Sequence, residues 1–287
     1  MPVGKGCHKM GKPKGNVDTW KLISLVVKGT LKDDCDGHAA EIAFYLFFAL
    51  FPCLLGLATL LAYLPAPDLF KVVLRAMDPF LPATVLSMVK ENLRTLAILQ
   101  KGGLLSFGLL LSLWTASNAM VAVQKALNDA YTADEQRPYW KVRLVSILLV
   151  ICLACFIVVS LLLLFWGPRI GVWIASLADL GTAFTMVWNL LRWPVIFWLM
   201  MMALSALYRY APAVRLSWRE TVPGVVAATG AWIAVTLVYS FYVNNYSTYV
   251  DTYGSTGAIV ALLVWMYASA LVVLVGGEIN ARMRELL

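Results

Sequence analysis

The sequence is poor in charged residues. Lys, Arg, Asp and Glu make up only 14% of its 287 residues, whereas a soluble globular domain carries about 25%. Apolar residues make up 61% of the chain, and the mean hydropathy is +0.77. These values indicate that lipid, rather than water, surrounds much of the protein.

Catalytic and metal-binding motifs are scarce as well. The chain has two histidines, His8 and His38, and both precede the first long apolar run. It contains no HExxH zinc motif, no nucleophile elbow and no Walker A loop. The five cysteines form no spaced framework, so they predict no disulfide. We therefore expect no metal, no cofactor, no ATPase and no enzymatic activity in this chain.

Long apolar runs account for most of what is present. About 20 apolar residues in a helix cross a hydrocarbon core of roughly 30 Å. Six runs of this kind predict an all-α, polytopic membrane protein with six transmembrane helices, and with amphipathic helices in the first outer loop at 68–101. The predicted spans are Ile42–Pro67, Gly102–Gln124, Leu144–Pro168, Met186–Tyr208, a fifth between Glu220 and Asp251, and Thr256–Gly277.

The distribution of basic residues predicts the domain organisation and the orientation. Residues 1–38 form a basic segment with seven lysines, and an amphipathic stretch from Thr19 to Leu31 predicts a helix on the membrane surface. Residues 39–287 form the six-helix domain. Sixteen of the 23 Lys and Arg residues lie in the N-terminal segment, the second and fourth loops and the C-terminal tail. The positive-inside rule therefore places both termini in the cytoplasm, and topology explains the net charge of +7 without a nucleic-acid partner.

Five tyrosines recur at helical spacing near the end of the fifth span. If one helix continues to a polar corner at Asp251–Gly257, their side chains share one face. An interfacial aromatic belt is one interpretation. A stripe of about 21 Å along the axis fits the wall of a hydroxyl-lined groove better, because a belt occupies a single depth. The five are Tyr239, Tyr242, Tyr246, Tyr249 and Tyr253.

Two acids lie at the edges of spans. Glu41 is about one turn inside the first span, and Glu278 closes the sixth. Each could line a cavity and respond to a proton or cation, because ionisable groups within membranes are costly and often functional. The alternative for Glu41 is an acid at a helix N-terminus in reach of water. The alternative for Glu278 is an i, i+4 pair with Arg282.

Several further residues have predicted structural roles. Pro52 should kink the first span, Pro212 lies in the fourth loop, and Gly254 turns the polar corner. Ser217 and Glu220 form a capping box before the fifth span. Asn118 is either a pathway residue or an interhelical hydrogen-bonding amide.

The order and spacing of ten short stretches resemble the YihY/BrkB family of inner-membrane proteins, once labelled ribonuclease BN. The resemblance covers nearly all of 33–285. It implies six transmembrane helices and a multi-pass location in the bacterial cytoplasmic (inner) membrane. At position 41 such proteins often carry a small or amide residue, so a role for Glu41 would be particular to this chain. The matching stretches are 39–45, 50–52, 80–83, 113–117, 126–131, 137–141, 207–212, 218–224, 253–255 and 276–280.

The resemblance and the residues together favour a transporter or translocase of a lipid-like, amphipathic envelope component. A non-transporting scaffold or regulator of an envelope complex is the second hypothesis. A membrane nuclease or lipid-modifying enzyme is the third. The expected partners are membrane lipids and either further copies of the chain or an envelope protein. The predicted pathway residues are Glu41, Tyr45, Asn118, Tyr242, Tyr249, Tyr253 and Glu278.

Overall fold

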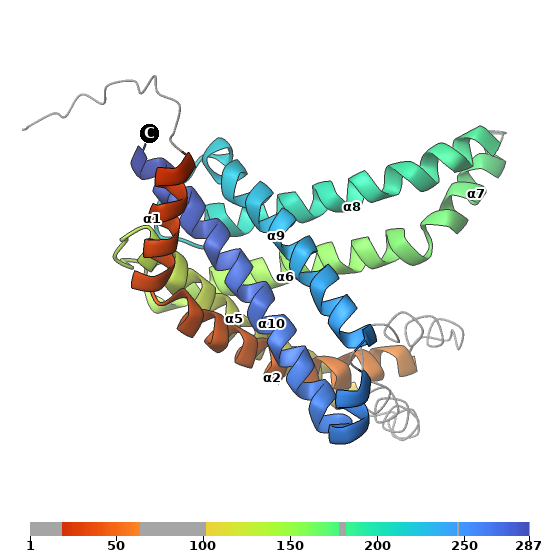
Figure 1. The fold of residues 1–287 in the computed structure, drawn as a ribbon. Helices are drawn as coiled ribbons and strands as arrows, with labels where there is room; N and C mark the ends of the chain where they lie inside the picture. Colours follow the sequence, from red (N-terminus) through yellow and green to blue (C-terminus); the bar gives the residue numbers. More distant parts are fainter. Residues whose placement is uncertain (1–18, 64–101, 178–181, 246, 287) are drawn as a thin grey trace, which may run out of the picture.

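The computed structural model describes residues 19–63, 102–177, 182–245 and 247–286, and every element within these ranges is an α-helix (Figure 1). The all-α prediction is therefore confirmed. The amphipathic helices predicted at 68–101 lie outside the described residues. The helices are α1 (Thr19–Lys32), α2 (Cys35–Tyr63), α5 (Gly102–Ala130), α6 (Tyr139–Phe165), α7 (Gly167–Leu177), α8 (Thr182–Tyr210), α9 (Trp218–Asn245) and α10 (Ser247–Leu286).

Six of these helices are long and apolar enough to cross a membrane, which confirms the predicted number of spans. The spanning segments differ from the predicted ones at their ends, most at the first span, which ends at Leu54 rather than Pro67. They are Cys35–Leu54, Phe107–Ala130, Tyr139–Leu164, Phe184–Tyr210, Trp218–Val243 and Ile259–Leu286.

Local sequence signals set several of the helix boundaries. The backbone N–H of Ser217 donates to Glu220 Oε2 at 2.6 Å, and the N–H of Glu220 donates to Ser217 Oγ at 3.4 Å. This reciprocal pair is the predicted capping box at the start of α9. Pro138, in an extended conformation, precedes α6. α2 continues through Pro52 without a break, because neighbouring groups can compensate for the missing backbone donor in a membrane helix.

The predicted polar corner at Asp251–Gly257 is wrong. α9 ends at Asn245 and α10 begins at Ser247, so the predicted corner, Gly254 included, belongs to the first turns of α10. Ser, Thr, Asp and Gly favour turns over helices, but these propensities are weak and the tertiary context can override them. Tyr239 and Tyr242 therefore lie on α9 and Tyr249 and Tyr253 on α10, so these four do not share one helix, and Tyr246 lies outside the described residues.

The core lies where α2, α5 and α10 pack together, with Tyr208 of α8 inserted from the side. Alanines on α2 and α5 keep these helices close, as small residues do in membrane proteins. Gly224 of α9 and Gly276 of α10 also make a close contact, since a β-carbon on Gly224 would overlap the carbonyl oxygen of Gly276. The Tyr208 hydroxyl donates to the Val273 carbonyl at 2.7 Å and so joins α8 to α10.

α6 and α8 are the least buried of the spanning helices. They pack against each other and run to α7 at the edge of the molecule, away from α2 and α10 (Figure 1). In an 18-residue apolar stretch of each span only 6% of the residues are buried, compared with 44% in the corresponding stretch of α5. Their apolar side chains therefore face outward, as expected for lipid-facing helices.

Candidate functional site

Most of the polar side chains that join different helices gather at one end of the bundle, although Trp188 and Trp232 make such hydrogen bonds elsewhere. Because the six spans run alternately up and down, this end holds the starts of α2, α6 and α9 and the ends of α5, α8 and α10. We call it the polar end. It contains three clusters, which are centred on Arg282, Arg137 and Arg143.

The first is the carboxylate cluster, formed by Asp33, Glu278 and Arg282. Arg282 Nε lies 3.2 Å from Glu278 Oε2, and Arg282 Nη2 lies 2.8 Å from Asp33 Oδ2. The Glu278 side chain is 0% exposed, and its Oε1 has no hydrogen-bond partner among the described residues. The cluster thus places two acids against one guanidinium in an enclosed position, where charge is costly.

α1 closes this cluster from outside the bundle. Gly29 packs against it so tightly that a β-carbon there would come within 2.5 Å of Glu278 Oε2 and 2.7 Å of Arg282 Nη2. The buried Cys35 is the first residue of α2, directly after the short connection from α1. The amphipathic helix predicted at 19–31 therefore exists, and its inner face covers the Glu278 carboxylate and the Arg282 guanidinium. Its outer face exposes apolar side chains, among them Trp20 and Leu31.

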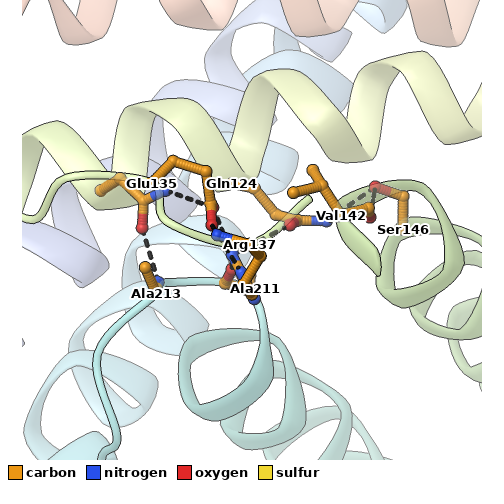
Figure 2. Close-up of polar contacts among 8 residues, drawn as sticks. Gln124, Glu135, Arg137, Val142, Ser146, Ala211 and Ala213 are labelled. Atoms are coloured by element: carbon orange, nitrogen blue, oxygen red, sulfur yellow. Dashed lines mark hydrogen bonds and ion pairs between the residues drawn. The ribbon is translucent and has the colours of Figure 1, made fainter. Parts of the chain in front are cut away.

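The second cluster joins the α5–α6 loop to the α8–α9 loop (Figure 2). Arg137 Nη2 donates to the carbonyl of Ala211 at 2.9 Å and pairs with Glu135 at 2.7 Å. Asn128 donates to Glu135 at 3.0 Å and accepts from the N–H of Ala213 at 2.6 Å. Hydrogen bonds from the Arg137 side chain lower the pKa of Glu135 to about 2. This cluster fixes two loops to each other at the polar end.

Gln124 extends the same network into the contact between α5 and α6. Its side-chain nitrogen donates to Ser146 Oγ at 2.6 Å and to the Val142 carbonyl at 3.3 Å, while its oxygen accepts from Arg137 at 3.3 Å (Figure 2). The buried amide is therefore satisfied on both sides, as buried polar groups require.

The third cluster surrounds Arg143 near the start of α6. Nη1 donates to Ser117 Oγ at 2.7 Å and to Asn118 Oδ1 at 2.8 Å, and Nη2 donates to the Tyr139 hydroxyl at 2.8 Å. The guanidinium carbon lies 4.4 Å from the centre of the Trp114 ring. Asn118, predicted as either a pathway residue or an interhelical amide, thus binds an arginine on the neighbouring helix.

The structure separates the other predicted pathway residues. Glu41 is 43% exposed and lies 3.7 Å from His38, which in turn contacts Asp129 at 3.2 Å. This position matches the alternative interpretation of an acid near a helix start. Tyr45 packs at the edge of the core, and Tyr242 is exposed on α9. The backbones of Tyr249 and Tyr253 belong to α10, and their side chains lie outside the described residues.

The predicted pair of Glu278 with Arg282 is confirmed, but sequence reasoning missed the other partners of the three arginines. An i, i+4 spacing pointed to Arg282 with Glu278, but no local pattern indicates that Asp33 joins them from 249 residues away. The described residues contain no group of three His, Cys, Asp or Glu side chains that could hold a metal ion. A small cavity of about 60 Å³ lies between α6 and α8, beside Trp188 and Arg192.

Comparisons with known proteins identify relatives over the whole six-helix region. The model of the family described as virulence factor BrkB matches residues 26–286. The ribonuclease-like protein YfkH of Bacillus subtilis is 40% identical over 92% of this chain and 95% of its own length. A UPF0761 membrane protein of Alkalilimnicola ehrlichii is 26% identical over 96% of the chain, and one of Paraburkholderia xenovorans is 27% identical over 94%. The chain spans 63% and 62% of the length of these two proteins. No solved structure matches.

Proposed function

The chain belongs to the BrkB virulence factor family of membrane proteins, and from this premise we propose that it translocates a lipid-like, amphipathic envelope component without an ATPase of its own. Within this proposal the polar end is the cytoplasmic gate. The protein sits in the bacterial inner membrane with both termini in the cytoplasm.

The carboxylate cluster is the observation that carries the proposal. A gate needs a contact that is stable in one state and can be released in another. Glu278 and Asp33 share one arginine, so the enclosed cluster holds one negative charge that no described cation balances. A proton or a cationic group can neutralise this charge, which changes how strongly α1 is held against α10. A fully balanced ion pair would offer no such control.

The exposed apolar faces support an amphipathic substrate. α6 and α8 are almost entirely unburied along their spans, and α9 exposes Leu237, Val238 and Phe241. An acyl chain can stay in contact with such surfaces while its headgroup moves past polar side chains. Of the predicted pathway residues, Tyr242 lies on the exposed face of α9 and Glu278 in the carboxylate cluster, and we place these two along that route.

A scaffold or regulator without transport is the second candidate, and one observation favours it. The contact of Gly224 with Gly276 is tight, and the cavity of about 60 Å³ is far smaller than a lipid. A scaffold would keep these helices packed throughout its work. A translocase must separate some of its helices during each cycle.

The decisive experiment measures lipid movement in vesicles. The purified chain is reconstituted with a fluorescent phospholipid in both leaflets, and an impermeant quencher reports the fraction that crosses the membrane. We expect faster crossing than in protein-free vesicles. Glu278→Gln should slow it about tenfold, the equivalent of 1.4 kcal/mol in the barrier.

Glu285→Gln is the matched control. Glu285 also contacts Arg282, at 2.8 Å, but from the exposed side. In vesicles with this variant, lipid should cross the membrane at the wild-type rate. Equal rates with and without protein, across lipid classes and with or without a proton gradient, would favour the scaffold. Cleavage of RNA by the pure chain, lost on Asp34→Ala, would instead support an enzyme.

A further inference from the structure

Arg143 is charged but has only neutral partners. It is the fifth residue of α6 and lies inside the spanning segment Tyr139–Leu164. Its three hydrogen bonds go to the hydroxyl of Ser117, the amide oxygen of Asn118 and the phenol of Tyr139. None of these groups carries a negative charge at neutral pH.

The arginines at the centre of the other two clusters differ in this respect. Arg137 lies 2.7 Å from a Glu135 oxygen, and Arg282 lies 2.8 Å from an Asp33 oxygen. Among the described residues, no ion pair includes Arg143. Its Nε is enclosed and has no acceptor there either. Charged groups in membrane spans are normally paired, so the counter-charge of Arg143 has to come from outside these residues.

Two donors remain for such a counter-charge. A guanidinium has five N–H groups, and the three hydrogen bonds occupy both on Nη1 and one on Nη2. Besides the enclosed Nε–H, the second Nη2 hydrogen is therefore left over. The amide nitrogen of Asn118 also has no partner in the described part of the chain, since the only hydrogen bond of this side chain uses its oxygen. These two donors suit a phosphate oxygen, which accepts short, charge-assisted hydrogen bonds.

Aromatic rings beside Arg143 indicate that the anion is attached to an apolar body. Trp114 is 52% exposed although its ring stacks on the guanidinium, and Tyr139 is 67% exposed. Leu110, Leu144 and Leu148 are exposed on the same two helices. Trp and Tyr prefer the level of lipid headgroups. A free inorganic anion would make no use of these surfaces.

We propose that Arg143 and Asn118 bind the phosphate group of an anionic phospholipid, with Tyr139 beside its headgroup and Trp114 against the start of its acyl chains. The site uses the exposed rim between α5 and α6. It does not depend on the carboxylate cluster or on translocation, so it can be present whether or not lipid crosses the membrane.

Lipid retention tests this site directly. The full-length chain is purified in a mild detergent with an equimolar mixture of phosphatidylglycerol and phosphatidylcholine, and native mass spectrometry measures the lipid that stays bound. We expect preferential retention of phosphatidylglycerol. Arg143→Gln should reduce it about tenfold, because one charge-assisted contact is lost. Lys141→Gln removes the same charge two residues away and should leave retention unchanged.

Asn118→Asp provides a second variant that keeps the arginine. A carboxylate at this position would supply the missing counter-charge within the protein. We expect it to lower phosphatidylglycerol retention as far as Arg143→Gln does, and to raise the thermal midpoint in zwitterionic lipid. This result would show that an anion, rather than general packing, was missing, even if Arg143→Gln folds poorly.

Three outcomes would overturn the proposal. The first is equal retention by the wild type and by both site variants. The second is an equal loss in Lys141→Gln, which would indicate only a general effect of basic charge. The third is complete displacement of phosphatidylglycerol by an equal concentration of inorganic phosphate, which would show that the lipid body contributes nothing.

Discussion

Gly29 of α1 lies directly against the Glu278 carboxylate of α10, with no room for even a single methyl group between them. The contact joins a helix outside the spanning bundle to the only described acid that is fully enclosed within a span. A glycine at this position is therefore required by close approach rather than by backbone conformation.

The first prediction concerns this contact. Gly29→Val should push α1 away from the carboxylate cluster and expose Cys35, whose side chain is buried where α2 begins. In a chain whose other four cysteines are replaced by serine, labelling of Cys35 with a maleimide should become about tenfold faster, since overpacking costs roughly 1–3 kcal/mol. Ser24→Val, on the exposed side of α1, should leave the labelling rate unchanged. Equal rates in all three chains would show that α1 does not cover this residue.

The second prediction concerns the pH dependence of the link between two loops. The pKa of Glu135 falls from 4.5 to about 2 in the folded protein because Arg137 donates hydrogen bonds to it. A lowered folded-state pKa stabilises the protein above the unfolded value, and this stabilisation is lost as the pH falls from about 4.5 to about 2. The wild type should therefore melt at a higher temperature than Glu135→Gln at pH 6, and the difference should disappear near pH 2. A constant difference across that range would contradict the link.

The third prediction compares two glycines of α9. Gly224→Ala should destabilise the protein by about 2 kcal/mol or more, because its methyl group would overlap the backbone of Gly276 and the side chain of Asn280. Gly230→Ala meets no atom within 4 Å, so it should be neutral or stabilise by up to about 1 kcal/mol through helix propensity. Thermal unfolding in detergent measures both. Equal effects would mean that α9 and α10 are not packed as described.

The fourth prediction places the polar end in the cytoplasm. Arg219 at the start of α9 and Arg169 in α7 are both exposed and lie at opposite ends of the bundle (Figure 1). The assay uses cells that have lost the outer membrane but keep a sealed inner membrane. An impermeant maleimide should label Arg169→Cys directly. It should label Arg219→Cys only after the inner membrane is permeabilised. The reverse labelling pattern would show that the protein has the opposite orientation and that the proposed gate lies at the other face of the membrane.

The spans could be predicted from the sequence because a membrane segment depends on composition over about 20 residues. The capping box at Ser217 and Glu220 could be predicted because both partners lie within one turn. The corner at Asp251–Gly257 could not, since polar residues are compatible with a turn or with the first turns of a helix. In the structure α9 already ends at Asn245, so the described tyrosines of the expected face are divided between α9 and α10.

The sequence by itself determined that this chain is a helical membrane protein with six segments long and apolar enough to cross a membrane, because these properties follow from local hydropathy. Only the tertiary structure decided which charges meet. It joined Asp33 to Arg282, fixed Arg137 to the loop at Ala211, and left Arg143 among neutral oxygens. A side chain's charge is known from its identity, but its electrostatic partners depend on helices that are distant in the chain and adjacent in space.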